Sequence, residues 1–378
     1  MADVTGERLD VDGLLADPAT RIVVCCGAGG VGKTTTAAAV GLRAAEVHGR
    51  RTVVLTIDPA RRLAQSMGLS ELDNTPRQVK GIDGDNGGEL HAMMLDMKRT
   101  FDEVVQQHTT PQRASEIFAN PFYQAMSSTF AGTQEYMAME KLGQLRATDE
   151  WDLIVVDTPP SRSALDFLDA PARLSRFLDG RMLRMLLAPA RSGGRSMFSL
   201  VTASFGLFSR TVQKILGAQL LTDLSGFVAA LDSMFGGFRQ RADQTYRILQ
   251  DPQTAFLLVA APERDAVREA AYFAERLVAE RMPLAGLVLN RMHRTEAPGL
   301  TAEQSEAAAE ALTAAGDSPL TADALRIHAA LVRQTEREQR VAATFTDAFP
   351  SVPTVSVTAQ PADVHDVDGL RTIGSLLA

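Results

Sequence analysis

A glycine-rich stretch between an apolar run and an alanine-rich run places the strongest constraint on how this chain can fold. Residues 21–26 read Arg-Ile-Val-Val-Cys-Cys, which has the β-branched character of a short buried strand. Residues 33–48 are rich in alanine and predict a helix. Between them, residues 27–32 read Gly-Ala-Gly-Gly-Val-Gly. A strand, a glycine loop and a helix in this order predict the start of a parallel α/β sheet.

The same stretch satisfies the pattern G-x-x-x-x-G-K-[S/T], which is typical of phosphate binding. Its glycines allow successive backbone N–H groups to turn inward around phosphate oxygens, and the following helix presents the positive end of its dipole. We expect Lys33 to place its charge on the β- and γ-phosphates, and the Thr34 hydroxyl to bind Mg²⁺. The predicted nucleotide-binding residues of this loop are Gly27, Gly29, Gly30, Val31, Gly32, Lys33, Thr34 and Thr35.

Further apolar runs along the chain have the length and composition of strands. They cover residues 52–57, 90–95, 153–156, 256–260, 284–289 and 352–357. Because these runs are continuously apolar and alternate with helical segments, we expect a mostly parallel sheet that is flanked by helices on both faces. Together with the phosphate loop, this pattern predicts an α/β fold of the P-loop NTPase class.

Two aspartates follow strands of this predicted sheet, at the edge where ligands of parallel sheets bind. Asp157 ends the run at 153–156, and the apolar-strand-then-Asp pattern predicts that it holds Mg²⁺ through a water molecule. Asp58 ends the run at 52–57 and is then available to orient or deprotonate the attacking water. Asp58 and Lys33 are therefore the predicted catalytic residues. The alternative for each aspartate is a helix N-cap or a turn.

Two long stretches contain no convincing strand and predict an inserted helical subdomain. We expect a nucleotide-binding core at 1–99, 149–171 and 251–378, and a helical subdomain at 100–148 and 172–250. Half of the 14 methionines lie in the helical stretches. They are Met126, Met137, Met139, Met182, Met185, Met197 and Met234. Because methionine suits adaptable apolar surfaces, one interpretation is a groove for a hydrophobic client, and the alternative is that these side chains form the subdomain's own core.

Composition narrows the environment and the partners that we expect. The net charge of −8 argues against nucleic acid or an anionic membrane as the main partner. Residues 1–12 are polar and acidic, unlike a signal peptide, and no apolar run approaches the roughly 20 residues of an integral membrane segment. The two cysteines, Cys25 and Cys26, are adjacent, which disfavours a disulfide and indicates small core residues. A cytoplasmic location is the resulting prediction.

Three segments together resemble the arsenite-pump and tail-anchored-protein-targeting ATPase family, a branch of the deviant Walker A ATPases. They are Gly27–Thr35, Asp58-Pro-Ala and Asp157-Thr-Pro-Pro. The resemblance implies an ATP hydrolase that uses ATP and Mg²⁺ and whose dimer closes on ATP. It also implies a homodimer, or a heterodimer with a sister ATPase, and a hydrophobic client or partner protein.

The resemblance also assigns roles to individual residues. Thr56–Leu63 is similar to the family's first switch, whose aspartate, here Asp58, is the catalytic one. Residues 157–168 are similar to the second switch. Asn290 stands where the family's asparagine reads adenine, and Gln360 and Pro361 lie where its adenine-covering loop follows the last strand. The segment Asp363-Val-His365-Asp366 could suggest a metal, but we interpret it as the capped start of a C-terminal helix.

The chain departs from the family where a signature lysine is expected, because the second loop position is Ala28. In the family that lysine crosses the dimer to the partner's phosphates. Either Arg61, Arg62 or Arg162 supplies the missing charge, or a sister chain supplies it in trans. The zinc-binding Cys-x-x-Cys of the targeting members and the thiolates that arsenite requires are also absent. Two alternative functions remain, a partition-like ATPase on a surface and a module that senses ATP without hydrolysing it.

Overall fold

The computed structural model describes most of the chain, and two compact units account for it. The described residues are 7–57, 62–69, 71–121, 123–124, 133–159, 240 and 243–378. One unit contains the described residues of Met1–Leu95, Leu145–Leu165 and Arg247–Ala378. The other contains those of Asp96–Gln144 and Asp166–Tyr246. The phosphate loop and all strands in the described residues belong to the first unit.

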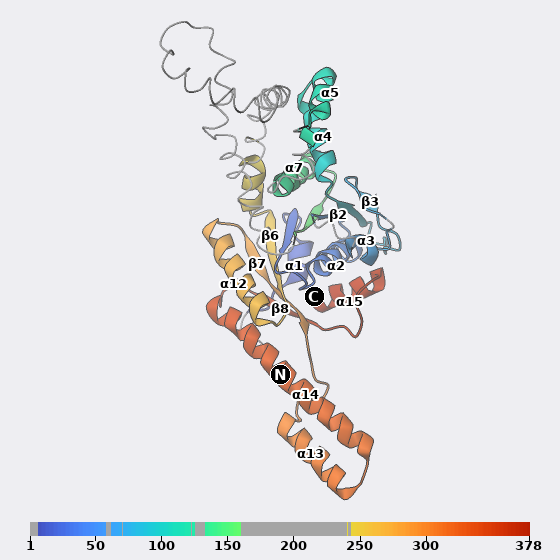
Figure 1. Cartoon of the computed structure of the whole chain (residues 1–378), viewed down its shortest axis with the longest axis vertical. Coiled ribbons are helices and arrows are strands. Elements are labelled where there is room, and N and C mark those ends of the chain that lie inside the picture. The colour runs from blue at the N-terminus through green and yellow to red at the C-terminus, as the bar shows by residue number, and fades with distance from the viewer. Residues whose placement is uncertain are drawn as a thin grey trace, which may run out of the picture. The chain divides into compact units, whose positions relative to one another are not determined.

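An eight-stranded sheet forms the centre of the first unit, in the order β3-β4-β2-β5-β1-β6-β7-β8 (Figure 1). The strands are β1 Ile22–Cys26, β2 Arg51–Thr56, β3 Arg77–Gln78, β4 Glu89–Met94, β5 Leu153–Asp157, β6 Thr254–Ala260, β7 Leu284–Met292 and β8 Thr354–Thr358. All neighbouring pairs are parallel except β3 with β4. The predicted α/β fold with a mostly parallel sheet is therefore confirmed.

The sequence missed one strand, and the largest error in a predicted strand boundary is at the end of β7. Strand β3 has two exposed residues, so no apolar run marks it, and only its pairing with β4 makes it a strand. Strand β7 continues to Met292, three residues beyond the predicted end, because Asn290 and Arg291 interrupt the apolar run but not the strand. Asn290 therefore lies inside β7 and not after it.

The described helices begin and end close to the sequence signals for caps. They are α1 Val11–Ala16, α2 Lys33–Glu46, α3 Arg62–Ser66, α4 Met97–His108, α5 Pro111–Ala119, α7 Thr133–Thr148, α12 Arg264–Ala279, α13 Ala302–Ala315, α14 Pro319–Ala348 and α15 Val367–Leu377. Asp366 caps α15 by accepting a hydrogen bond from Gly369 N at 2.8 Å, which confirms the capped-helix interpretation of that segment.

Helix α2, which follows the phosphate loop, is anchored at its far end by two groups of charged side chains. Asp12 of α1 accepts two hydrogen bonds of 2.6 Å from the Arg43 guanidinium and lies 2.9 Å from His48 Nε2. Glu46 accepts a hydrogen bond of 2.7 Å from Arg371 of α15. Together with the buried alanines of α2, which pack against the sheet, these contacts hold the helix and the loop at its start in place.

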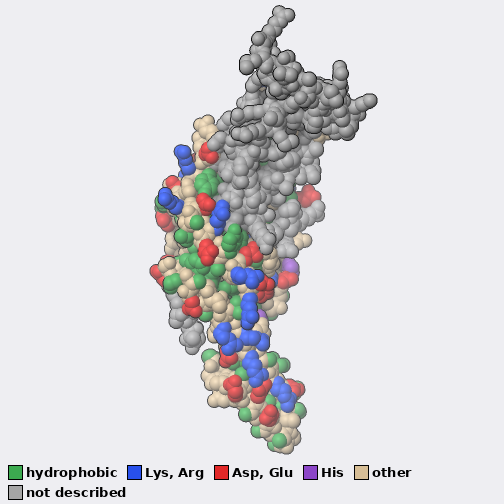
Figure 2. All heavy atoms as spheres, turned by 60° about the vertical axis from the view of Figure 1, so that its left-hand side comes forward, with side chains coloured by type: hydrophobic (Ala, Val, Ile, Leu, Met, Phe, Trp, Pro, Cys, Tyr) green, Lys and Arg blue, Asp and Glu red, His purple; other side chains and the backbone are tan. Residues whose placement is uncertain are grey.

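Helices α13 and α14 form a hairpin that extends away from the sheet (Figure 1). Figure 2 shows Lys and Arg side chains gathered along the lower part of one face. Two arginines of α14 form ion pairs within the hairpin, Arg326 with Asp323 at 2.8 Å and Arg333 with Glu306. Even α14, which has 30 residues, carries too many charges for a membrane span, and no other described helix combines the length and apolarity to cross a bilayer.

Several predictions fall on residues that lie outside the described part of the chain. They include Asp58, Arg61, Arg162, most of the second switch and nearly all of 172–250. Arg62 begins α3, but its side chain is not among those described. Of the seven methionines singled out, Met137 and Met139 are described, and both are buried in α7.

Candidate functional site

The glycine loop joins β1 to α2 at the carboxyl edge of the sheet, and its glycines permit close packing there. Gly27 and Gly32 have positive φ, at +153° and +95°. A Cβ on Gly27 would lie 2.0 Å from the Val259 carbonyl oxygen of β6, and a Cβ on Gly32 would lie 2.2 Å from Asn290 Nδ2 of β7. No side chain fits at either position, so one end of the loop packs against β6 and the other against β7.

The Lys33 side chain reaches back from the start of α2 to the beginning of the phosphate loop. Its Nζ donates a hydrogen bond of 2.7 Å to the Ala28 carbonyl, and its side chain is buried. As the first residue of α2, Lys33 also stands at the positive end of the helix dipole. The loop therefore brings an ammonium group and a helix N-terminus to one place, an arrangement suited to a polyphosphate.

The structure brings Thr34 and Asp157 together at the carboxyl edge, although 123 positions separate them in the chain. The Thr34 hydroxyl donates to Asp157 Oδ2 at 2.8 Å, and the carboxylate is fully buried. A hydroxyl and a carboxylate are the hard oxygen donors that Mg²⁺ prefers, so these residues fit the predicted ion. Their direct hydrogen bond also fits a carboxylate that reaches Mg²⁺ through a bound water.

Two threonines that sequence reasoning did not single out support Asp157. Thr56, the last residue of β2, donates to the same Oδ2 at 2.8 Å, because Thr56 and Asp157 are register partners in neighbouring strands. Thr158 donates its hydroxyl to the Cys25 carbonyl at 2.8 Å and so ties the residue after β5 to β1. The signal available in the sequence was position, since Thr56 is the last residue but one of one predicted strand and Thr158 comes two residues after another.

Cys25 and Cys26 are core residues of β1, as predicted, with 0% and 4% of their surface exposed. Burial raises the pKa of both thiols, that of Cys26 to about 12. The nearby Asp157 carboxylate raises the pKa of Cys25 further. Both thiols therefore stay protonated at neutral pH, and neither suits nucleophilic chemistry or soft-metal binding.

Asn290, Gln360 and Pro361 lie on the β7–β8 side of the loop. Asn290 is buried, and its Nδ2 donates a hydrogen bond of 2.8 Å to the Val31 carbonyl. Gln360 follows β8 and donates to the Thr358 carbonyl at 2.9 Å, while Pro361 beside it is exposed. Asn290 thus contacts the loop directly, whereas Gln360 and Pro361 stand one strand further away.

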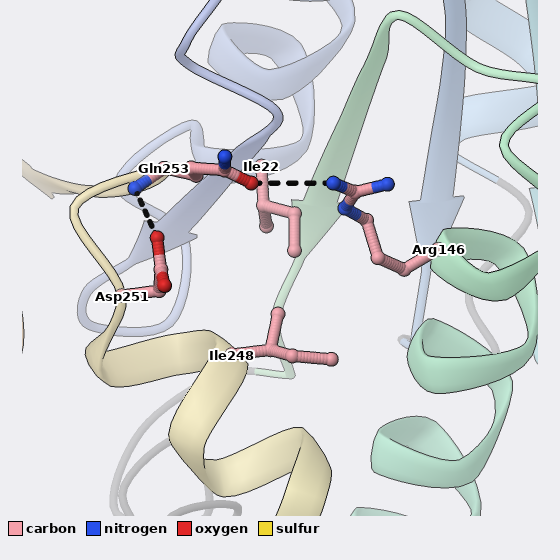
Figure 3. Close-up of a pocket in the computed structure, with 5 residues that line it drawn as sticks. All are labelled: Ile22, Arg146, Ile248, Asp251 and Gln253. Carbon is pink, nitrogen blue, oxygen red and sulfur yellow. Dashed lines mark hydrogen bonds between the residues drawn. The ribbon is translucent and has the colours of Figure 1, made fainter.

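A separate pocket of about 230 Å³ opens at the opposite edge of the sheet, where β1 and β6 begin. Figure 3 shows Arg146 beside Gln253, with Ile22 and Ile248 as apolar walls. Arg146 Nη2 donates to Gln253 Oε1 at 3.2 Å, and Arg146 Nη1 pairs with Asp149 at 3.1 Å. Asp251, the other charged residue of the pocket, accepts a hydrogen bond of 2.9 Å from Gln253 N. Both charged side chains therefore have partners within the protein, and the pocket is not part of the phosphate site.

Comparison with known proteins agrees with this geometry. The model of a family described as Anion-transporting ATPase matches residues 20–299. The chain is 28% identical over 165 residues to ATPase GET3 of Malassezia globosa, covering 44% of this chain and 46% of that protein. It is 31% identical over 162 residues to a putative arsenical pump-driving ATPase of Prosthecochloris vibrioformis, covering 41% and 36%.

The longer alignments are weaker in identity. ATPase ASNA1 homolog 2 of Paramecium tetraurelia is 23% identical over 289 residues, which covers 74% of this chain and 78% of that protein. The alignments with the Malassezia and Prosthecochloris proteins span less than half the length of those relatives. The similarity is thus strongest over a part of the chain and extends more weakly over most of it.

Proposed function

This chain belongs to the anion-transporting ATPase family, and from that premise we propose that it is a Mg²⁺-dependent ATP hydrolase. The observation that carries the proposal is the arrangement at the carboxyl edge of the sheet. There the Lys33 ammonium donates a hydrogen bond to the Ala28 carbonyl of the phosphate loop, and the Thr34 hydroxyl donates one of 2.8 Å to Asp157 Oδ2. A charge for the phosphates and oxygen donors for the metal stand together, which is what phosphoryl transfer from ATP to water requires.

Each residue has a role in the proposed reaction. The amides of residues 27–34 and the Lys33 ammonium bind the β- and γ-phosphates and stabilise the charge that develops there. Thr34 and Asp157 would hold a magnesium ion, which would neutralise negative charge on the phosphates. Asp58 comes two residues after Thr56, the last residue of β2, and we assign it the orientation or deprotonation of the attacking water.

The absence of a charge at Ala28 bears on how the site is completed. Ala28 is 8% exposed and packs in the hydrophobic core cluster of the first unit, and a methyl group reaches no phosphate. We propose that ATP closes a dimer and that a lysine of a sister ATPase completes this site in trans, with one of Arg61, Arg62 or Arg162 as the alternative source of charge. The nucleotide state would then control the binding of a hydrophobic client or partner protein.

Arsenite is a poor candidate for the ligand, although one relative is named a putative arsenical pump-driving ATPase. Arsenite binding requires accessible thiolates, and the two cysteines of this chain are buried and protonated. A hydrophobic protein client fits the chain better than arsenite does. Such a client is what the resemblance to the tail-anchored-protein-targeting ATPases implies.

The proposal is tested by measuring ATP turnover of the purified chain with Mg²⁺, alone and with any homologous ATPase encoded nearby. Hydrolysis that requires Mg²⁺ and disappears in Lys33→Ala supports the assignment. ATP binding without turnover, alone and with the partner, would favour the second candidate function, a nucleotide-sensing module. The observation that favours this candidate is Ala28, which stands where the family has its signature lysine. No ATP binding under either condition would rule out both.

A further inference from the structure

We propose that Asn290 is a positioning residue of the phosphate loop, which sets the affinity of the loop for any polyphosphate whatever base it carries. The inference rests on the proposed function, because it concerns the same site. It differs from the role that the family resemblance implies, which is to read adenine.

The hydrogen bond ties a strand to the loop. Asn290 Nδ2 donates to the Val31 carbonyl at 2.8 Å, and the asparagine side chain is buried. No peptide bond in the described chain is cis, so the Val31 carbonyl and the Gly32 N–H point in opposite directions. Holding the carbonyl toward β7 therefore turns the Gly32 N–H away from β7 and into the loop, where phosphate oxygens bind.

The close approach shows that this contact is built into the loop. Gly32 has φ +95°, and a Cβ at this position would lie 2.2 Å from Asn290 Nδ2. Only glycine leaves room for the amide. The same Gly32 precedes Lys33, so the peptide that Asn290 holds lies directly before the lysine that is expected to meet the phosphates.

A β-bulge in β7 lies next to Asn290 and accounts for the direction of its side chain. Leu289 pairs with Ser356 and Met292 with Thr358, so three steps along β7 face two along β8. Arg291 takes up the extra residue with φ +61°, an uncommon conformation for a residue other than glycine. Bulges of this kind redirect a side chain next to functional sites. Here the bulge lies immediately after Asn290.

Positioning and base reading predict different patterns of loss, which equilibrium titration can separate. The ligands are ATP, GTP and inorganic tripolyphosphate, each with Mg²⁺. In Asn290→Ala we expect affinity for all three to fall by a common factor of about tenfold, since the loop loses one buried hydrogen bond. The ratio of ATP to GTP affinity should stay at the wild-type value. Loss for ATP alone, with tripolyphosphate unchanged, would overturn the inference.

The matched control is Asn86→Ala. Asn86 also donates its Nδ2 to a backbone carbonyl, that of Glu46 at 2.9 Å, but it lies at the opposite end of α2 from the loop and is exposed. We expect its three affinities to equal those of the wild-type chain. A loss as large as that of Asn290→Ala would show that the effect is general destabilisation.

A second measurement keeps the inference testable if Asn290→Ala folds poorly or if the chain binds no nucleotide. Asn290→Asp is nearly isosteric but has no N–H to donate to Val31. In the nucleotide-free protein we expect hydrogen exchange of the segment around Val31 and Gly32 to become faster in this variant and to stay unchanged in Asn86→Ala. Unaltered exchange would refute the positioning role. Failure of the wild-type chain to bind any of the three ligands would instead refute the proposed function.

Discussion

Thr56 offers the sharpest test of how the carboxyl edge of the sheet is built. It is 1% exposed, and its hydroxyl donates to Asp157 Oδ2 at 2.8 Å. Thr56→Val keeps the shape of the side chain and its preference for a strand, so it opens no cavity. What it removes is a buried hydrogen bond to an acidic side chain, which contributes about 1.5–3 kcal/mol when the acceptor is charged.

The control variant comes from the same strand. Thr52 is fully buried, and its hydroxyl donates to the neutral Arg50 carbonyl at 3.3 Å, a long and weak hydrogen bond. We expect Thr52→Val to lower the free energy of unfolding by about 1 kcal/mol or less. The assay is urea unfolding of both variants and of the wild-type chain, followed by circular dichroism, with the slopes compared to check that the transition is unchanged.

The two variants should also differ in magnesium dependence. Thr56 orients the carboxylate that Thr34 contacts, so Thr56→Val should raise the Mg²⁺ concentration that supports ATP binding, whereas Thr52→Val should not. Equal loss of stability in the two variants, with equal magnesium dependence, would refute the view that Thr56 holds Asp157 for the metal. Its hydroxyl would then be one more buried hydrogen bond of the sheet.

Three further predictions follow from the site and its supports. Lys33→Ala should abolish tight ATP binding, measured by titration, whereas Asp58→Asn should keep binding and lower turnover by roughly 10²-fold or more; equal loss of binding would make Asp58 structural. Stimulation of turnover by a sister ATPase should vanish when the sister's second-position lysine is changed to alanine, and stimulation that survives would exclude the trans mechanism proposed for Ala28. The hydrogen bonds from Arg43 lower the pKa of Asp12 from 3.8 to about 2, so their stabilisation is present above pH 3.8 and is lost as the pH falls toward 2. Asp12→Asn should therefore lower the free energy of unfolding at pH 7 by about 1 kcal/mol, a value reduced for solvent screening because the carboxylate is one-third exposed. Between pH 3.8 and 2 the stability of this variant, measured by urea unfolding, should depend less on pH than that of the wild-type chain. An equal pH dependence in the two proteins would contradict the assignment.

Local patterns in the sequence were sufficient to predict the phosphate loop, the core strands and the cap of the last helix. The phosphate loop is contiguous, and its strand and helix stand directly beside it, so composition and glycine spacing predicted all three. The core strands are continuously apolar because helices cover a parallel sheet, and that made them visible without knowledge of their order. The cap at Asp366 was predicted for the same reason, because a cap depends on residues three apart.

The tertiary structure alone decided what supports the site. Asn290 meets Val31 across 259 positions of chain, and Thr56 meets Asp157 across 101. Such contacts depend on which strands are neighbours and in what register, and neither order nor register can be read from the composition of one strand. The bulge at Arg291 and the exposed strand β3 have no local signal either, because each exists only through pairing with a neighbour. The sequence by itself therefore determined the phosphate loop and the sheet type, and the packing of distant strands determined how that loop is held.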